Sequence, residues 1–114
     1  MEQLTPAEKF RLTNLGAVAG VRASAPAILM GLSIVNNQAA VIFVQLFDVA
    51  TVGAVTLGTT VPTFEFNGAA SVPLMPPLAA GGMKFRNGLQ MASSTTEGGA
   101  TPSAAGVFAF GLIV

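Results

Sequence analysis

The sequence predicts an all-β protein built as a single β-sandwich, and three observations support this prediction. Short stretches of the chain alternate between apolar and polar or small residues, which is the period of a strand with one buried face. Turn-forming dipeptides such as Asn-Gly and Pro-Pro separate these stretches at regular intervals. The chain has 13 glycines and 7 prolines in 114 residues, and no apolar stretch after Gly20 keeps a helical period. We therefore expect seven to eight short antiparallel strands that follow a jelly-roll or immunoglobulin-like path.

The beginning of the chain departs from this pattern and predicts a short helix. Thr5 suits the N-cap position, Pro6 suits the first helical position, and Glu8 can return the capping hydrogen bond. Gly16 is a common residue just after the end of a helix. The helix is therefore expected over residues 6–15.

Charge also sets the beginning of the chain apart. Charged side chains are dense in the first dozen residues, whereas residues 23–83 hold only Asp48 and Glu65. We therefore expect an N-terminal arm of residues 1–20 and a β-sandwich domain of residues 21–114. The alternatives for the first part are a frayed terminus and an arm that becomes ordered on a neighbouring subunit. The contrast in charge favours the arm.

The first strand of the body is expected over residues 28–35, where the sequence alternates. Residues 36–38 form a turn after it, because Asn tolerates the left-handed backbone conformation. One face of this strand is expected to carry four apolar side chains: Ile28, Met30, Leu32 and Ile34.

The next strand, over residues 41–47, is apolar on both faces. Its side chains divide into two sets, which are Ile42, Val44 and Leu46 on one face and Val41, Phe43 and Phe47 on the other. Two apolar faces on an antiparallel strand indicate sheet packing on one side and a second contact on the other. We therefore expect Phe43 and Phe47 to contact another subunit.

Five further strands complete the predicted sandwich. They are expected over residues 63–66, 71–75, 83–85, 89–93 and 107–114. Turns are expected at residues 67–68 and 87–88, which are both Asn-Gly. The last strand is expected to place Phe108, Phe110 and Leu112 on one face.

The residue types exclude most catalytic chemistry. The chain has no His and no Cys, which removes catalytic triads, thiol nucleophiles, disulfides and thiolate zinc sites. Asp48 and Glu65 remain as a candidate carboxylate pair for glycoside hydrolysis, or as rim groups, one of which pairs with Lys84 or Arg86. The second interpretation is favoured, so we expect no enzyme, no cofactor and no metal site.

Lys84 and Arg86 form the basic cluster of the body. They either grip an acidic patch of a partner or keep a solvated strand edge from pairing with another edge. The formal net charge of zero argues against a nucleic-acid partner, which needs a basic surface.

Membrane insertion is not expected. The apolar stretches at residues 25–35 and 39–44 fall short of the roughly 20 residues of a membrane-spanning helix. The acidic beginning of the chain is unlike a secretory signal. We therefore expect a soluble protein that is made in a cytoplasm and has no membrane partner.

The scarcity of charge predicts self-association. Charged residues make up 9% of the chain, against about 25% in an ordinary soluble domain, and hydrophobic residues make up 52%. The core of one small domain cannot absorb that much apolar material, and exposed apolar patches mark interaction sites. The candidate contact residues are Phe10, Arg11, Arg22, Phe43, Phe47, Lys84 and Arg86.

Six stretches of the body carry a resemblance, at residues 21–24, 31–37, 43–48, 61–64, 71–74 and 82–89. Together they resemble small β-sandwich virion proteins of tailed bacteriophages, of the kind that decorate or cement a capsid. The resemblance implies a homotrimer whose N-terminal arm reaches the capsid lattice or a neighbouring subunit. It also implies the major capsid protein or another virion protein as partner, in a virion assembled in the host bacterial cytoplasm.

The expected function is therefore that of a trimeric capsid decoration or cement protein, which stabilises the phage head by apolar burial and by its arm. An alternative is a lectin-like or receptor-binding module of a phage fibre, spike or tail, with recognition in the loops at residues 50–60 and 94–103. A third hypothesis is a small hydrolase that uses Asp48 and Glu65.

Overall fold

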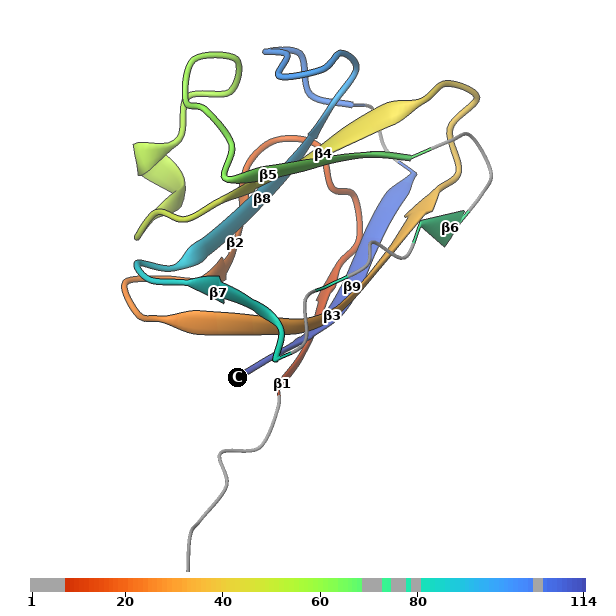
Figure 1. The fold of residues 1–114 in the computed structure, drawn as a ribbon. Coiled ribbons are helices and arrows are strands. Elements are labelled where there is room, and N and C mark those ends of the chain that lie inside the picture. The colour runs from red at the N-terminus through yellow and green to blue at the C-terminus, as the bar shows by residue number, and fades with distance from the viewer. Residues whose placement is uncertain (1–7, 69–72, 75–77, 79–80, 104–105) are drawn as a thin grey trace, which may run out of the picture.

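Two antiparallel sheets stack face to face around one apolar core (Figure 1). The computed structural model describes residues 8–68, 73–74, 78, 81–103 and 106–114. The strands in this part of the chain are β1 (Glu8–Leu12), β2 (Ala19–Arg22), β3 (Ala27–Asn36), β4 (Ile42–Phe47), β5 (Phe64–Gly68), β6 (Pro73–Leu74), β7 (Met83–Phe85), β8 (Leu89–Ser94) and β9 (Val107–Ile113). One 3₁₀ turn, η1 (Val52–Ala54), follows β4. The predicted all-β sandwich is confirmed, and the described residues hold one strand more than the upper number expected.

The strands divide between two sheets. Sheet A has the order β1-β9-β3-β6, and β7 also pairs with β3. Sheet B has the order β2-β8-β4-β5. All of these pairs are antiparallel. Sheet A thus joins strands from both ends of the described sequence, because β9 lies between β1 and β3.

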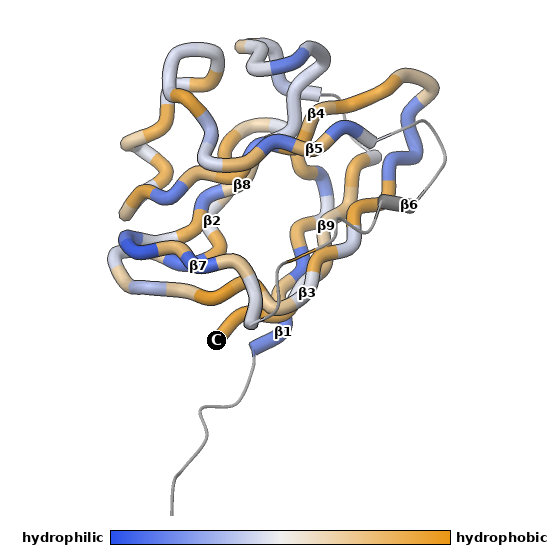
Figure 2. The backbone as a smooth tube through the Cα atoms, viewed as in Figure 1, coloured by the Kyte–Doolittle hydropathy of each residue, from blue (hydrophilic) through white to orange (hydrophobic). Residues whose placement is uncertain are grey.

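The core lies between the two sheets. Residues that are directly opposite in an antiparallel pair share a face of the sheet, so each row of side chains can be followed from strand to strand. Ile113 and Leu29 share a buried row of sheet A, and Met91 and Leu46 share a buried row of sheet B. Figure 2 shows hydrophobic residues concentrated along β3, β4 and β9, the strands at the centre of the sandwich.

The predicted N-terminal helix is wrong from Glu8 onward. Residues 8–12 form β1, which pairs with β9 from Glu8 opposite Ile113 to Leu12 opposite Ala109. The capping signal at residues 5 and 6 lies outside the described residues. Pairing with β9 outweighs the local helix signal because it buries one face of the segment. Helix propensity is a weak preference that tertiary contacts often override.

Residues 8–20 therefore belong to the sandwich and not to an arm. Leu15 is 1% exposed and is part of the core cluster. Its backbone N–H donates to Val107 O at 2.8 Å, and Gly16 O accepts from the backbone N–H of Ser93 at 2.9 Å. The segment between β1 and β2 is thus bonded to both sheets.

A β-bulge changes which side chains of β3 face the core. The pairing with β9 shifts between Leu29 and Gly31, so Met30 is an extra residue in the strand. Leu29 before the bulge and Ile34 after it are both fully buried, whereas Met30 is 44% exposed. The predicted apolar face is therefore correct for Leu32 and Ile34 and wrong for Ile28 and Met30.

The two Asn-Gly turns have different outcomes. At the predicted turn of residues 87–88 the chain bends from β7 of sheet A to β8 of sheet B, so a change of direction is present but the two strands form no hairpin. Asn67 and Gly68 instead extend β5, where they lie opposite Phe43 and Ile42. No helix of the described residues has the length and the apolar character needed to cross a membrane.

Candidate functional site

The outer face of sheet B is covered by loops of the same chain. Gln45 of β4 is fully buried, and its amide group donates to Ser94 Oγ at 2.8 Å and to Gly99 O at 3.4 Å. Gln90 of β8 is 1% exposed and donates to Val49 O at 3.0 Å. These bonds hold the loops after β4 and after β8 over the sheet, on the upper side of the view in Figure 1.

This cover changes the expected role of β4. Phe47 lies in the same outer row as Gln90 and is only 1% exposed. It is therefore buried within its own chain, contrary to the prediction of a subunit contact. Phe43 lies on the same face, opposite Ser94, and is half-buried. The second apolar face of this strand is real, but loops of the same chain cover most of it.

The outer face of sheet A is open in the described part of the chain. Its side chains form four rows, which are Lys9 with Leu112 and Gly31, Arg11 with Phe110 and Ser33, Phe108 with Val35, and Val114 with Ile28 and Lys84. Phe110 is 37% exposed and Leu112 is 39% exposed. Met30, on the bulge, adds a third exposed apolar side chain. Most of this face is therefore apolar and in contact with solvent.

A shallow groove of about 520 Å³ crosses this face. Phe110 and Leu112 line it, together with Lys9 and Arg11 on β1. Gly31 also lines the groove, and a Cβ atom added there would meet no other atom within 4 Å. The absence of a side chain at this position thus keeps space open beside the apolar rows.

The charged side chains on this face are all basic among the described residues. Lys9 and Arg11 of β1 and Lys84 of β7 border the apolar rows, and all three are exposed. None of the described carboxylates points out from this face. Glu8 lies in an inward-facing row of β1, Asp48 lies in a pocket beside Lys84 and Arg86, and Glu65 and Glu97 belong to β5 and the loop after β8.

The two carboxylates considered for hydrolysis both hold loops in place. Asp48 accepts hydrogen bonds from the backbone N–H groups of Arg86 at 3.1 Å and Asn87 at 2.8 Å, which fixes the turn before β8. Glu65 accepts from the backbone N–H of Gly98 at 2.8 Å, which fixes the loop after β8. The contact between Asp48 and Arg86 is thus a hydrogen bond from the Arg86 backbone N–H to the Asp48 carboxylate. No cluster of three metal-ligating carboxylates occurs within the part of the chain that the structure describes.

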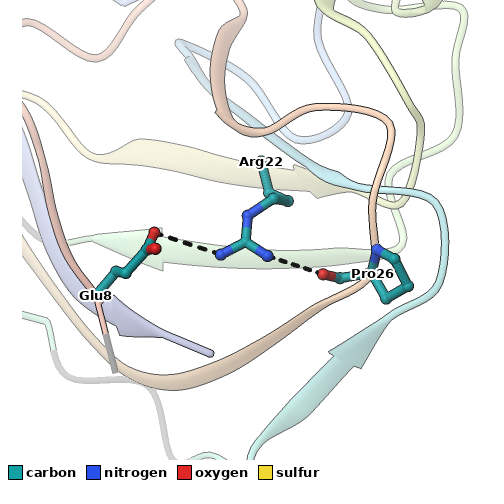
Figure 3. Close-up of polar contacts among 3 residues, drawn as sticks. All are labelled: Glu8, Arg22 and Pro26. Carbon is teal, nitrogen blue, oxygen red and sulfur yellow. Dashed lines mark hydrogen bonds and ion pairs between the residues drawn. The ribbon is translucent and has the colours of Figure 1, made fainter. Parts of the chain in front are cut away.

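Arg22 makes its contacts inside its own chain (Figure 3). One guanidinium nitrogen lies 3.4 Å from the Glu8 carboxylate, and the other donates to Pro26 O at 3.0 Å. Because Glu8 belongs to sheet A and Arg22 to sheet B, the ion pair ties the two sheets together at one end of the sandwich.

The remaining predicted contact residues lie in three places. Phe10 packs against the core cluster, close to the backbone of Gly111, whereas Arg11 and Lys84 lie on the outer face of sheet A. Arg86 is exposed in the turn beside Asp48.

The exposed residues Phe110, Leu112 and Met30 were missed as contact candidates. Alternation in residues 107–114 does place Phe110 and Leu112 on one face. It does not say whether that face is turned toward the core or toward solvent. That information comes only from the position of β9 in the sheet.

No protein-family model, no curated protein and no solved structure matches this chain.

Proposed function

We propose that the protein is a self-associating structural subunit of a virion, namely a trimeric decoration or cement protein of a phage head. One observation carries the proposal, which is the open and apolar outer face of sheet A. Monomeric soluble proteins rarely expose a large contiguous apolar patch, and such patches mark contact surfaces. The further partner in this proposal is the major capsid protein or another virion protein.

The energy of covering this face favours a contact that takes in all four rows. Full burial of a Leu, Met or Phe side chain stabilises by about 1.5–3 kcal/mol. Because Met30, Phe110 and Leu112 are 44%, 37% and 39% exposed, covering them contributes roughly 1 kcal/mol each. A stable interface of standard size buries about 800 Å² on each partner, so the neighbouring rows must take part.

The charge balance is compatible with high copy number. The formal net charge of the chain is zero, so neighbouring copies experience little overall repulsion. A protein that covers a lattice must pack many copies side by side, and scarce charge suits that task.

The alternative roles have less support. The loop after β8 is bonded to sheet B through Gln45 and Glu65, and residues 94–103 hold no aromatic side chain on which a sugar ring could stack. A hydrolase would need Asp48 and Glu65 as reactive carboxylates, but both accept backbone N–H groups of turns.

Two measurements test the proposed function. Sedimentation of the purified full chain at micromolar concentration should give a species of three times the 11.5 kDa chain mass. A reconstruction of virions that contain the protein should place it on the head shell. A stable monomer at tens of micromolar, or density on the tail alone, would contradict the proposal.

A further inference from the structure

We propose that copies of this chain join head to tail, with the outer face of sheet A of one copy docked on the acidic loops over sheet B of the next. The occupant of the open face is thus a second copy of the same chain. This inference rests on the proposed self-association, and it names the two surfaces that meet.

The first argument is the segregation of charge between two sides of the sandwich. The outer face of sheet A carries Lys9, Arg11 and Lys84. Glu65 and Glu97 belong to sheet B and the loop after β8, on the other side of the core, whereas Asp48 lies beside Lys84 and Arg86. Because the two sheets face each other across that core (Figure 1), their outer faces point away from one another. The outer face of sheet A and the loop after β8 therefore carry side chains of opposite charge.

The loop after β8 provides the acidic surface. Glu97 is exposed in this loop. Glu65 of β5 binds the backbone N–H of the next residue, Gly98, at 2.8 Å, which brings a second carboxylate close to Glu97. Glu65 and Glu97 therefore belong to the same loop region, since Glu65 binds the residue that follows Glu97.

The second argument excludes the simpler symmetric contact. If two copies packed their sheet A faces on each other, both sets of basic side chains would lie in one interface, without a carboxylate from the described residues of either face. Like charges that face each other across an interface weaken it and select against that pairing. A head-to-tail contact brings the basic border of the apolar rows to the carboxylates of the next copy.

The third argument is the shape of the two surfaces. The groove beside Gly31 has room that no described side chain fills. The loop after β8 is made of small residues, Ser, Thr, Gly and Ala, around Glu97, so it can approach the backbone at the groove closely. A contact between different surfaces closes into a ring only if the rotation between copies permits it, and otherwise continues as a filament. The proposed trimer therefore requires that the loop after β8 meets the groove at an angle, since surfaces on directly opposite sides would stack into a filament.

A pair of charge reversals tests this contact in the full chain. Arg11→Glu changes the basic surface, and Glu97→Lys changes the acidic one. Each variant alone should raise the dissociation constant of the oligomer by about tenfold or more, measured by sedimentation velocity. An equimolar mixture of the two should associate more tightly than either variant alone. The matched control is Arg86→Glu, which makes the same charge change in an exposed turn and should not weaken the oligomer.

The outcomes separate this inference from the proposed function. If the wild-type chain is an oligomer and Glu97→Lys leaves it unchanged, the head-to-tail contact is wrong and the self-association stands. If Arg11→Glu mixed with wild type associates more tightly than wild type alone, the contact is symmetric, which also overturns the inference. If the wild-type chain is a monomer, both proposals fail.

A further experiment tests an alternative occupant of this apolar and basic face, which is an anionic membrane surface. Wild type and Arg11→Glu are sedimented with phosphatidylglycerol vesicles. Binding that Arg11→Glu abolishes, with no effect of the same variant on the oligomer, would overturn the docking of a second copy. Circular dichroism of every variant should match the wild type, because all three substituted side chains are exposed.

Discussion

Arg11 lies over the ring of Phe110, with its guanidinium carbon 5.6 Å from the ring centroid. The two residues face each other across β1 and β9. A cation over an aromatic ring is worth about 0.5–1 kcal/mol at an exposed site. The stack therefore holds a positive charge at the edge of an apolar surface, so one face combines both properties.

Replacement of Phe110 by Ser should weaken self-association and leave the fold nearly unchanged. The side chain points outward and contributes to the open face, so its loss removes contact area between copies. We expect a clear shift toward smaller species in sedimentation at equal concentration. The matched control is Val61→Ser, since Val61 is 85% exposed and lies outside sheet A. If both variants had the same oligomer stability, the loss of any exposed apolar side chain would have the same effect, and the outer face of sheet A would have no special role in self-association.

Substitution by Ala should change stability differently at two neighbouring glycines, Gly111 and Gly31. At Gly111 an added Cβ would collide with the ring of Phe10 and lie 2.6 Å from Gly31 O, so Gly111→Ala should cost about 1–3 kcal/mol by overpacking. At Gly31 the Cβ meets nothing within 4 Å, and Gly31→Ala should fold as well as wild type. Denaturant unfolding of both variants checks the difference. A Gly111→Ala chain as stable as Gly31→Ala would mean that Phe10 does not occupy this place.

Leu15→Ala should reduce the free energy of unfolding by about 2–5 kcal/mol, the usual range for a buried Leu. Leu15 is 1% exposed and packs in the core, although it lies in the segment expected to be an arm. Val52→Ala serves as the control, because Val52 is 42% exposed. If Leu15→Ala and Val52→Ala had the same free energy of unfolding, Leu15 would not be part of the core and the predicted N-terminal arm would be supported.

Asp48→Ala should cost about 1–3 kcal/mol, because two backbone N–H groups of the turn at residues 86–87 lose their acceptor. Glu97→Ala, at an exposed loop position, should change stability by less than about 0.5 kcal/mol. Thermal unfolding measures both. Equal melting temperatures for the two variants would contradict the structural role of Asp48.

Strands with strong alternation were predictable from the sequence. In residues 108–112 large side chains alternate with Ala109 and Gly111, and β9 (Val107–Ile113) has Phe108, Phe110 and Leu112 on one face as expected. A change of chain direction before β8 was predictable as well from Asn87-Gly88, although it joins two different sheets. These features depend on neighbours in the sequence, which the sequence displays directly.

Features that depend on distant partners were not predictable. The segment at residues 8–12 has a local helix signal, and only its pairing with β9 makes it a strand. The bulge at Met30 has no local marker besides Gly31. The burial of Phe47 follows from loops that fold over sheet B, and alternation within β4 cannot reveal what lies above it. Of the predicted contact residues, Arg11 and Lys84 lie on the outer face of sheet A, whereas Phe43 and Phe47 lie on the outer face of sheet B.

The position of β9 between β1 and β3 also governs when the protein can fold during its synthesis. Both neighbours leave the ribosome long before β9 is made, and neither can complete its hydrogen bonding until β9 emerges. Pairings so distant in sequence form slowly and leave strand edges open meanwhile. The apolar strand β3 therefore keeps the edge that pairs with β9 open until the last strand emerges, and the chain is prone to aggregation during that interval.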